Sequence, residues 1–339
     1  MENSPIYIGG PDRCGKTTMR AFLASHPRIA IPSVGSNMWT YFYGQYDDLA
    51  KRANFERCLE AMLDYKHVAL LEPDPARIRQ EFWQGPPTYA RLFDLFLVHY
   101  AEREGKPRRG AQTGLIERYT EHLIAAYPGV KIIHMLRDPR DRYEASLALW
   151  PNGKGLVGGA TARWLYSLNL AKRYQRRYPD QYMIVRYEDM VTWPEQTVRQ
   201  VCAFLNEEFV PTMLTMDGAL KHREQLTKGA KLEPGAIPVS PDYIGGYRGK
   251  VSPREIAFMQ IFAGRSMQEH GYKLEPHPQS LADILHFSVV EWPLNLVRMA
   301  AWWTVEGLQQ TFPGYVRRKP GRRMILTKRS QAKRTPVSA

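Results

Sequence analysis

A short segment near the start of this 339-residue chain combines residue types that bind phosphate. Gly10, Gly15, Lys16 and Thr17 follow the spacing G-x-x-x-x-G-K-T, which is typical of nucleotide-binding loops. The glycines permit a tight turn in which backbone N–H groups face an anion, and a helix starting there adds the positive end of its dipole. The candidate binding residues are Arg13, Cys14, Gly15, Lys16, Thr17 and Thr18.

The elements that must position this loop can also be predicted from the sequence. Apolar residues from Ile6 onward predict a strand before the loop, and the sequence MRAFLASHP after Thr18 predicts a helix. Strands are then expected at 131–136 and 182–187, and helices at 139–148, 161–178 and 194–205. Alternation of strand and helix predicts an α/β fold, a P-loop-like parallel sheet with helices on both faces and ligands at the carboxyl ends of the strands.

Composition limits the classes of protein that remain. A hydrophobic content of 44% in a chain of this length allows a large core. The three cysteines, Cys14, Cys58 and Cys202, have neither paired nor metal-ligand spacing, so we expect a reducing compartment and no metal site. The loop follows the first residue so closely that we expect no signal peptide or membrane anchor before it.

The positive charge is concentrated at the end of the chain. The formal net charge is +13, and nine basic residues with no acid lie in 316–339, which leaves +4 for the rest. We expect residues 1–275 to form the α/β domain, 276–316 a helical extension and 317–339 a basic, disordered tail. The apolar and aromatic stretch 281–315 is interrupted by charges and Pro293, which predicts amphipathic helices packed on the body or on another subunit, or contact with a membrane surface. Nucleic-acid binding by the tail is a weaker alternative.

One family resemblance suggests a nucleotide kinase. The loop GPDRCGKTT is similar to that of thymidylate kinases, and Asp141-Arg142-Tyr143-x-x-Ser146 resembles the DRY-x-x-S motif of that family. Such an enzyme would use ATP and magnesium and would need a magnesium-binding aspartate at a strand end. The best candidate strand ends in Leu136-Arg137-Asp138, with the arginine first, so the resemblance is a local one.

A second resemblance extends over residues 6–272. The sequence IIHMLRDPRD at 132–141, followed by ASL at 145–147, looks like the segment of sulfotransferases that binds the 3′-phosphate of 3′-phosphoadenosine 5′-phosphosulfate (PAPS). VRYEDM at 185–190 resembles the next block of the bacterial carbohydrate-type branch, and YRGKVSP at 247–253 is similar to the closing element of the family. Arg13 to Thr17 matches the usual R-S-G-T-T of its loop, with Lys16 in place of a threonine.

This resemblance implies roles for individual residues. Arg13 and Lys16 would act in catalysis beside the bridging oxygen, and the loop would hold the 5′-phosphate. Arg137 and Ser146 would bind the 3′-phosphate, although the family serine usually lies one residue earlier, at the position of Ala145. Arg248 and Lys250 match the closing basic element. Such transfer needs in-line positioning and charge stabilisation, and a less charged group can dispense with magnesium.

The general base is the remaining catalytic role. A base must reach the acceptor hydroxyl and be unprotonated at the working pH. Glu117 is the expected base, with Glu72 as the alternative, whereas His134 lies in a strand and is expected to pack in the core. We therefore expect a cytoplasmic enzyme that moves the sulfuryl group of PAPS to a hydroxyl of a carbohydrate, lipid or small molecule. Contact with a membrane surface and assembly into a homo-oligomer are further expectations.

Overall fold

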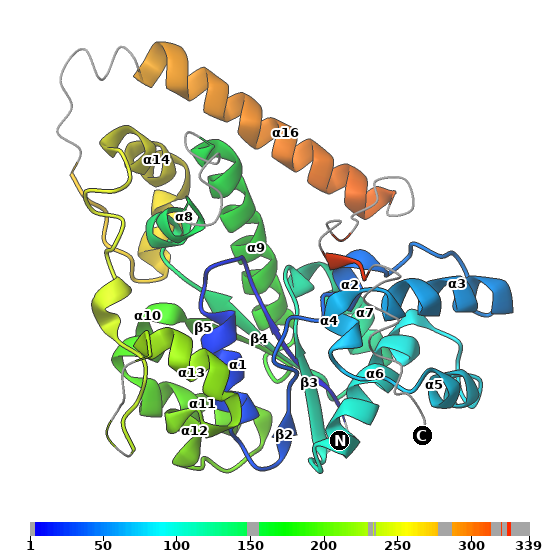
Figure 1. Ribbon diagram of the computed structural model, residues 1–339. Helices are drawn as coiled ribbons and strands as arrows, with labels where there is room; N and C mark the ends of the chain where they lie inside the picture. The colour runs from blue at the N-terminus through cyan, green and yellow to red at the C-terminus, as the bar shows by residue number, and fades with distance from the viewer. Residues whose placement is uncertain are drawn as a thin grey trace.

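A five-stranded parallel sheet lies at the centre of the computed structural model, which describes residues 4–147, 156–229, 233, 235–276, 287–312, 320 and 324–326 (Figure 1). The strand order is β2-β3-β1-β4-β5, so β1 is central and the chain extends the sheet on both sides of it. The strands are β1 (Ile6–Gly9), β2 (Ile29–Ala30), β3 (Arg108–Gln112), β4 (Lys131–Leu136) and β5 (Tyr182–Arg186).

Helices cover both faces of the sheet, and alternate residues of β1 face opposite sides. Tyr7 belongs to a core with α2 to α7, η1 and α9, whereas Ile6 and Ile8 pack in a second core with α1 and α10 to α12. Because both faces are buried, the central strands with the sequences IYIG and KIIHML are mostly apolar. The elements up to the middle of the chain are α1 (Lys16–Ala24), α2 (Met38–Tyr41), α3 (Arg52–Leu63), α4 (Lys66–Ala69), α5 (Pro75–Phe82), α6 (Tyr89–Arg103), η1 (Ile116–Tyr119), α7 (Thr120–Ala126), α8 (Pro139–Leu147) and α9 (Val157–Arg177).

In Figure 1, the second half of the chain first adds helices at the left of the sheet and then crosses the top of the view. The remaining elements are α10 (Tyr187–Thr192), α11 (Pro194–Leu205), α12 (Thr212–Thr215), η3 (Asp217–Ala219), α13 (Leu220–Thr227), η4 (Pro241–Tyr243), α14 (Pro253–Glu269), η5 (Phe287–Glu291, a π-helical turn) and α16 (Trp292–Thr311). Ser252 begins α14 with a capping box, in which its hydroxyl and the Glu255 carboxylate bond each other's backbone N–H. No helix among the described residues is both long enough and apolar enough to cross a bilayer.

The predicted α/β fold is confirmed, with small shifts at the ends of elements. The strand expected at 131–136 is β4, and the one expected at 182–187 ends one residue earlier. The helix expected at 139–148 is α8; Ala148, its predicted last residue, lies outside the described part. The helix expected at 161–178 is α9, which begins four residues earlier, and the one expected at 194–205 is α11.

The C-terminal part contains one long described helix and one contact of the tail. In Figure 1, α16 lies along the outside of the body, and its closest partner is α9. Ile325 of the predicted tail pairs with Tyr65 in an antiparallel bridge, and the Leu326 N–H donates to the Asp64 carbonyl at 2.8 Å. Residues 277–286 and most of 317–339 lie outside the described part, and the division at 275 and 316 stays a prediction.

Candidate active site

The loop between β1 and α1 turns at two glycines that have no room for a side chain. Their φ angles are 103° at Gly10 and 88° at Gly15, in the left-handed region that favours glycine. A Cβ at Gly10 would lie 2.3 Å from the Met135 carbonyl oxygen, and one at Gly15 would lie 2.6 Å from the Tyr187 ring. The loop therefore packs directly on β4 and on the start of α10.

The start of α1 is open to an anion. Neither a side-chain cap nor an acidic residue in the first turn occupies its free N–H groups. Lys16 folds back over the loop, where its Nζ donates to the Gly10 carbonyl at 2.7 Å and to the Pro11 carbonyl. The Arg13 side chain is exposed, its backbone is left-handed (φ 61°), and no acidic side chain of the described part pairs with it. Arg13 is thus the loop cation that is free to meet a ligand.

The other loop residues have different surroundings. Cys14 is buried, its Sγ donates to the Pro11 carbonyl at 2.6 Å, and burial raises the pKa of its thiol. The Thr17 hydroxyl accepts from Gln112 Nε2 at 3.4 Å, at the end of β3. The Thr18 hydroxyl is buried and lies 3.3 Å from His222 Nε2 on α13. Thr17 is therefore the better placed of the two threonines for an anion at the loop.

The second predicted anion-binding element reaches the loop through Arg137. This arginine follows β4 and is only 8% exposed. Its Nη1 donates to the Arg13 carbonyl at 3.2 Å, its Nη2 donates to the Tyr243 carbonyl at 3.0 Å, and its guanidinium lies over the Tyr187 ring, 4.3 Å from the centroid. Within the described part of the chain, its buried Nε has no hydrogen-bond partner. The structure thus brings together Arg13 and Arg137, which are far apart in the sequence.

Ser146 also contacts the loop, but through an acidic side chain. Its hydroxyl donates to Asp12 Oδ2 at 3.2 Å, and Asp12 Oδ1 accepts from Arg142 at 2.9 Å and pairs with Arg163 at 3.0 Å. Burial would raise the pKa of Asp12, but the two guanidinium groups hold it well below its usual range. Asp12 therefore stays ionised and ties α8 and α9 to the loop.

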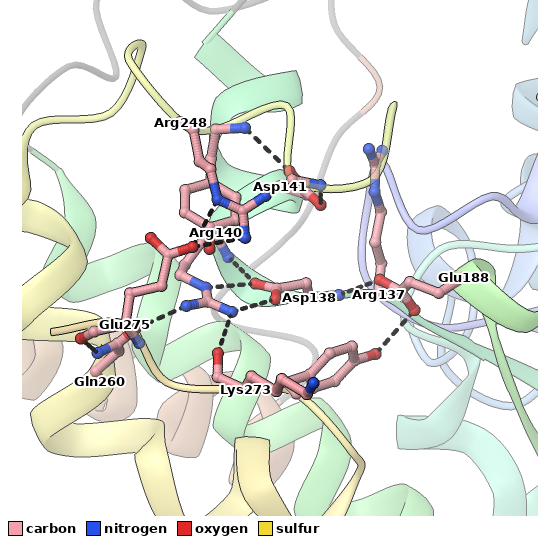
Figure 2. A network of polar contacts seen from close by, with 12 residues as sticks. Arg137, Asp138, Arg140, Asp141, Glu188, Arg248, Gln260, Lys273 and Glu275 are labelled. Atoms are coloured by element: carbon pink, nitrogen blue, oxygen red, sulfur yellow. Dashed lines mark hydrogen bonds and ion pairs between the residues drawn. The ribbon is translucent and has the colours of Figure 1, made fainter. Parts of the chain in front are cut away.

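A network of buried polar contacts holds Asp138, the residue that follows Arg137 (Figure 2). The Asp138 carboxylate receives two hydrogen bonds from the Arg140 guanidinium, at 3.0 and 2.7 Å, and the Asp138 N–H donates to Glu188 Oε1 at 2.9 Å. The Tyr272 hydroxyl donates to Glu188 Oε2 at 3.2 Å. Burial raises the pKa of Glu188 to about 7, so this carboxyl gains or loses its proton near neutral pH.

The closing element is held close to the site by its backbone. The Asp141 carboxylate accepts from the N–H groups of Gly245 and Tyr247, at 2.8 and 3.0 Å. Asp141 and its neighbours 142 and 146 were the residues that resembled the kinase motif. In this structure Arg142 and Ser146 contact Asp12 of the loop between β1 and α1, and Asp141 contacts the closing element.

The basic side chains of the closing element are paired on the surface. Arg248 binds Glu275 at 2.6 Å and Lys250 binds Glu144 at 2.9 Å. The two side chains are 64% and 62% exposed. Together with residues 249 and 251–253 they line a cavity of about 440 Å³. A phosphate would have to compete with Glu275 and Glu144 for these two cations.

Glu117 lies beneath the loop, in a buried chain of hydrogen bonds. Ser167 donates to Glu117 Oε1, the same hydroxyl lies 3.4 Å from His134 Nε2, and His134 Nδ1 lies 2.9 Å from the Tyr182 hydroxyl. Burial lowers the pKa of His134 to about 4, so this histidine is neutral, as expected for a core residue. Glu117 is fully buried, and its Oε2 has no hydrogen-bond partner among the residues that the structure describes.

The alternative base, Glu72, lies elsewhere. Its exposed carboxylate is 3.9 Å from Arg103, at the end of α6, just before β3 begins. The loop lies at the opposite, carboxyl end of the strands, so Glu72 is not brought to it. Within the described part, no group of three or more histidine, cysteine or acidic side chains gathers as a metal site.

Sequence reasoning missed Asp12 and its partner Arg163. Asp12 occupies an unconstrained position of the loop pattern, and Arg163 lies on a helix without any motif around it. The partial burial of this ion pair can be seen only after α9 is placed next to the loop. Arg142 did carry a signal, because it belongs to the DRY-x-x-S sequence, but the signal suggested a different chemistry.

The comparison with protein families identifies the class of protein. Residues 5–211 match the sulfotransferase family, and this match covers more than half of the chain. The chain belongs to the sulfotransferase family and is a transferase of that class. The prediction from the four sequence blocks is thereby confirmed at the level of the family, while the bacterial carbohydrate-type branch stays a prediction.

Individual relatives are distant. The chain is 24% identical over 242 residues to a protein-tyrosine sulfotransferase of Drosophila melanogaster, which covers 69% of this chain and 42% of that protein. The chain thus spans less than half the length of this curated relative. Among solved structures, the sulfotransferase domain of the Synechococcus PCC 7002 olefin synthase aligns with a TM-score of 0.52 and 20% identity over 80% of this chain and 97% of that domain. The likeness shows a shared fold.

Proposed function

We propose that this protein transfers the sulfuryl group of PAPS to a hydroxyl of an acceptor. The observation that supports the proposal is the contact between the loop and the end of β4. Arg137 bonds the Arg13 carbonyl, so an open helix start and a buried guanidinium adjoin. PAPS carries a 5′-phosphosulfate and a 3′-phosphate, and it therefore needs two neighbouring anion sites.

The residues present fit such a ligand. The N–H groups at the start of α1 and the Nε of Arg137 are donors that no side chain of the described residues accepts from. In the proposal, residues 14–18 of the loop hold the 5′-phosphate, Arg137 and Ser146 the 3′-phosphate, and Arg248 and Lys250 close over it. Arg13 and Lys16 stabilise the charge that develops on the bridging oxygen.

The transfer itself is a single displacement. The acceptor oxygen forms a bond to sulfur while the bond from sulfur to the bridging phosphate oxygen breaks, and 3′-phosphoadenosine 5′-phosphate leaves. The proton of the acceptor hydroxyl passes to a base, which we propose is Glu117. Its second carboxylate oxygen, which has no partner in the part of the chain that the structure describes, would take the proton. The proposal requires no metal.

Full burial of Glu117 gives the base assignment a clear test. If Glu117 is the base, Glu117→Gln should lower kcat by at least about a hundredfold and leave the melting temperature nearly unchanged. If Glu117 only holds Ser167 and His134 in place, the same substitution should lower the melting temperature, and the pH dependence of the residual kcat should stay that of the wild type.

The acceptor and the location of the enzyme complete the proposal. We propose a carbohydrate or lipid hydroxyl as acceptor and a cytoplasmic enzyme that meets a membrane surface. Among the aromatic residues near the start of the chain, Trp39 and Phe42 are buried in the core. Tyr43 instead lines a cavity of about 330 Å³, whose other aromatic walls are Tyr119, Tyr166 and Tyr174. Aromatic rings of this kind suit either a sugar or an apolar chain.

The main test is Arg13→Ala. The variant should abolish sulfuryl transfer while the circular dichroism spectrum and cooperative unfolding stay as in the wild type, because the Arg13 side chain is exposed. Arg13→Lys, which keeps the charge, should retain part of the activity. Arg265→Ala is the matched control, since this surface arginine is 93% exposed on α14. Full activity of Arg13→Ala would refute the proposed role.

The ligand test separates the proposal from the kinase alternative. 3′-Phosphoadenosine 5′-phosphate should raise the melting temperature in the absence of magnesium, because a ligand that binds only the folded state stabilises it. ATP with magnesium should have little effect. Stabilisation by ATP with magnesium alone would favour a kinase.

A further inference from the structure

The long C-terminal helix α16 has its two charged residues and its Asn295 on the side that faces the protein. Glu306 is buried and pairs with Arg118, which follows Glu117 in the chain. Asn295 is also buried, and its Oδ1 accepts from the Gly158 N–H at 3.0 Å. The only other charged residue of α16, Arg298, is half-buried and lies 3.5 Å from Asn295. Both charges of this helix are therefore turned toward the body.

The exposed residues of α16 are mostly apolar, and the polar ones among them, Thr304, Gln310 and Thr311, carry no charge. None of the exposed residues of the helix is charged. In Figure 1, α16 lies along the outside of the molecule, with α9 and α14 beneath it and no described element above it. The outer face, together with the preceding turn η5, exposes Val289, Val290, Leu294, Leu296, Val297, Trp303, Val305 and Leu308.

This distribution is the reverse of that on an ordinary surface helix. A surface helix of a water-exposed protein normally turns its apolar stripe inward and its charges outward. Isolated exposed apolar residues are common, but a contiguous row along a whole helix marks a surface that meets a partner. The face of α16 and η5 is therefore an interaction surface.

The charge of the neighbouring sequence indicates what this partner is. Nine basic residues and no acid follow in 316–339. A second copy of the chain would bring two such segments together, and like charges repel. An anionic bilayer attracts basic residues by about 1 kcal/mol each near its surface, and it accepts apolar side chains at the boundary of its acyl chains.

We propose that the outer face of α16 and η5 docks on the surface of an anionic lipid bilayer. The inner face stays on α9, so the helix lies parallel to the membrane with the body on its cytoplasmic side. The proposal rests on the face of α16 and the basic sequence, and it does not depend on the sulfotransferase activity.

Cosedimentation of the full chain with lipid vesicles tests this proposal. The protein should bind vesicles of phosphatidylglycerol and phosphatidylcholine at least about tenfold more strongly than vesicles of phosphatidylcholine alone. The double variant Val297→Glu with Trp303→Glu should lose most of this binding. These side chains are 65% and 41% exposed, so the fold should tolerate the change, which circular dichroism checks.

A matched control uses apolar residues far from α16. Trp193 and Leu220 are 63% and 58% exposed, near α11 and on α13. Their double substitution by glutamate adds the same charge and should leave vesicle binding unchanged. Equal binding by the Val297→Glu, Trp303→Glu variant and the wild type would overturn the proposal. A second result would also overturn it. In that result the wild type does not bind vesicles but forms a dimer in size-exclusion chromatography with light scattering, and the Val297→Glu, Trp303→Glu variant is a monomer.

Discussion

The two sides of the candidate donor site hold their cations in different ways. On the loop side, Arg137 is buried and donates hydrogen bonds to the backbone carbonyls of Arg13 and Tyr243. On the closing side, Arg248 and Lys250 are exposed and pair with the carboxylates of Glu275 and Glu144. The loop side is therefore preorganised by burial, whereas the closing side is held by contacts that water weakens.

The difference shows how sequence motifs should be weighed. A buried guanidinium that donates to carbonyl oxygens stays in place whether or not an anion is present. Its side chain therefore loses little conformational entropy when an anion binds. An exposed ion pair contributes at most about 1 kcal/mol, so Arg248 can leave Glu275 for a stronger anion at little cost. We expect substitutions on the loop side to have large effects and those on the closing side to have small ones.

Asp12→Ala should have the largest effect on stability. It removes the shared acceptor of Arg142, Arg163 and Ser146 and leaves buried positive charge without a partner. The free energy of unfolding should fall by about 3–5 kcal/mol in denaturant titrations. The control is Asp217→Ala, which breaks an exposed pair with Arg223 and should cost less than about 1 kcal/mol. Similar losses in the two variants would contradict the contrast.

Glu188 should make the loop side sensitive to pH. Its pKa is raised to about 7 in the folded protein, so between the ordinary value of 4.5 and 7 the folded state holds a proton that the unfolded state has lost. The free energy of unfolding must therefore fall as the pH rises from 4.5 to 7, by about 3 kcal/mol in all. Glu188→Gln should remove this contribution and flatten unfolding free energy measured from pH 5 to 8. A slope equal to that of the wild type would exclude Glu188 as its source.

Arg137→Lys tests the donor geometry on the loop side. A lysine keeps the charge but cannot bond both carbonyls and an anion in one plane. We expect a loss of about 2 kcal/mol in the affinity for 3′-phosphoadenosine 5′-phosphate, or roughly a thirtyfold rise in Kd by isothermal titration calorimetry. An unchanged Kd would place the second phosphate elsewhere.

Arg248→Ala and Lys250→Ala should have the smallest effects. Each removes an exposed ion pair, so the free energy of unfolding should change by less than about 1 kcal/mol. The Kd for the same nucleotide should rise by less than about tenfold, and the rise should shrink in high salt because exposed charges are screened. A larger loss than that of Arg137→Lys would reverse the proposed order of the two sides.

The sequence allowed most of the central architecture to be predicted. The loop, β4, β5 and α11 each carry a continuous apolar run, a glycine pattern or a helix start, and such signals are local. The short helices between residues 38 and 82 have none of this regularity and were not predicted. The order of the strands depends on contacts between distant segments, which no local pattern contains.

The sequence allowed the site residues to be named, but it did not show which other side chains they contact. Arg137 lies where the resemblance to sulfotransferases implied, because a strand end fixes it. Ser146 was expected to bind a phosphate, and in the structure its hydroxyl donates to Asp12, which the sequence did not indicate. Glu117 was expected to act as the base, and the sequence did not indicate that it is fully buried. In both residues the outcome depends on α8 and α9, whose packing on the loop the sequence does not display.

The central position of β1 has a consequence for the order in which the molecule folds. Although β1 is made first, its two neighbours are β3 and β4, and Ile6 pairs with Gly110 and Lys131. Contacts between residues so far apart form slowly, and during synthesis β1 must wait until both partners have been made. The loop between β1 and α1, which also packs on Met135 and Tyr187, should therefore take its shape late in folding. Variants that slow the pairing of β3 or β4 should leave this loop, rather than the helices at the edges, as the last part to form.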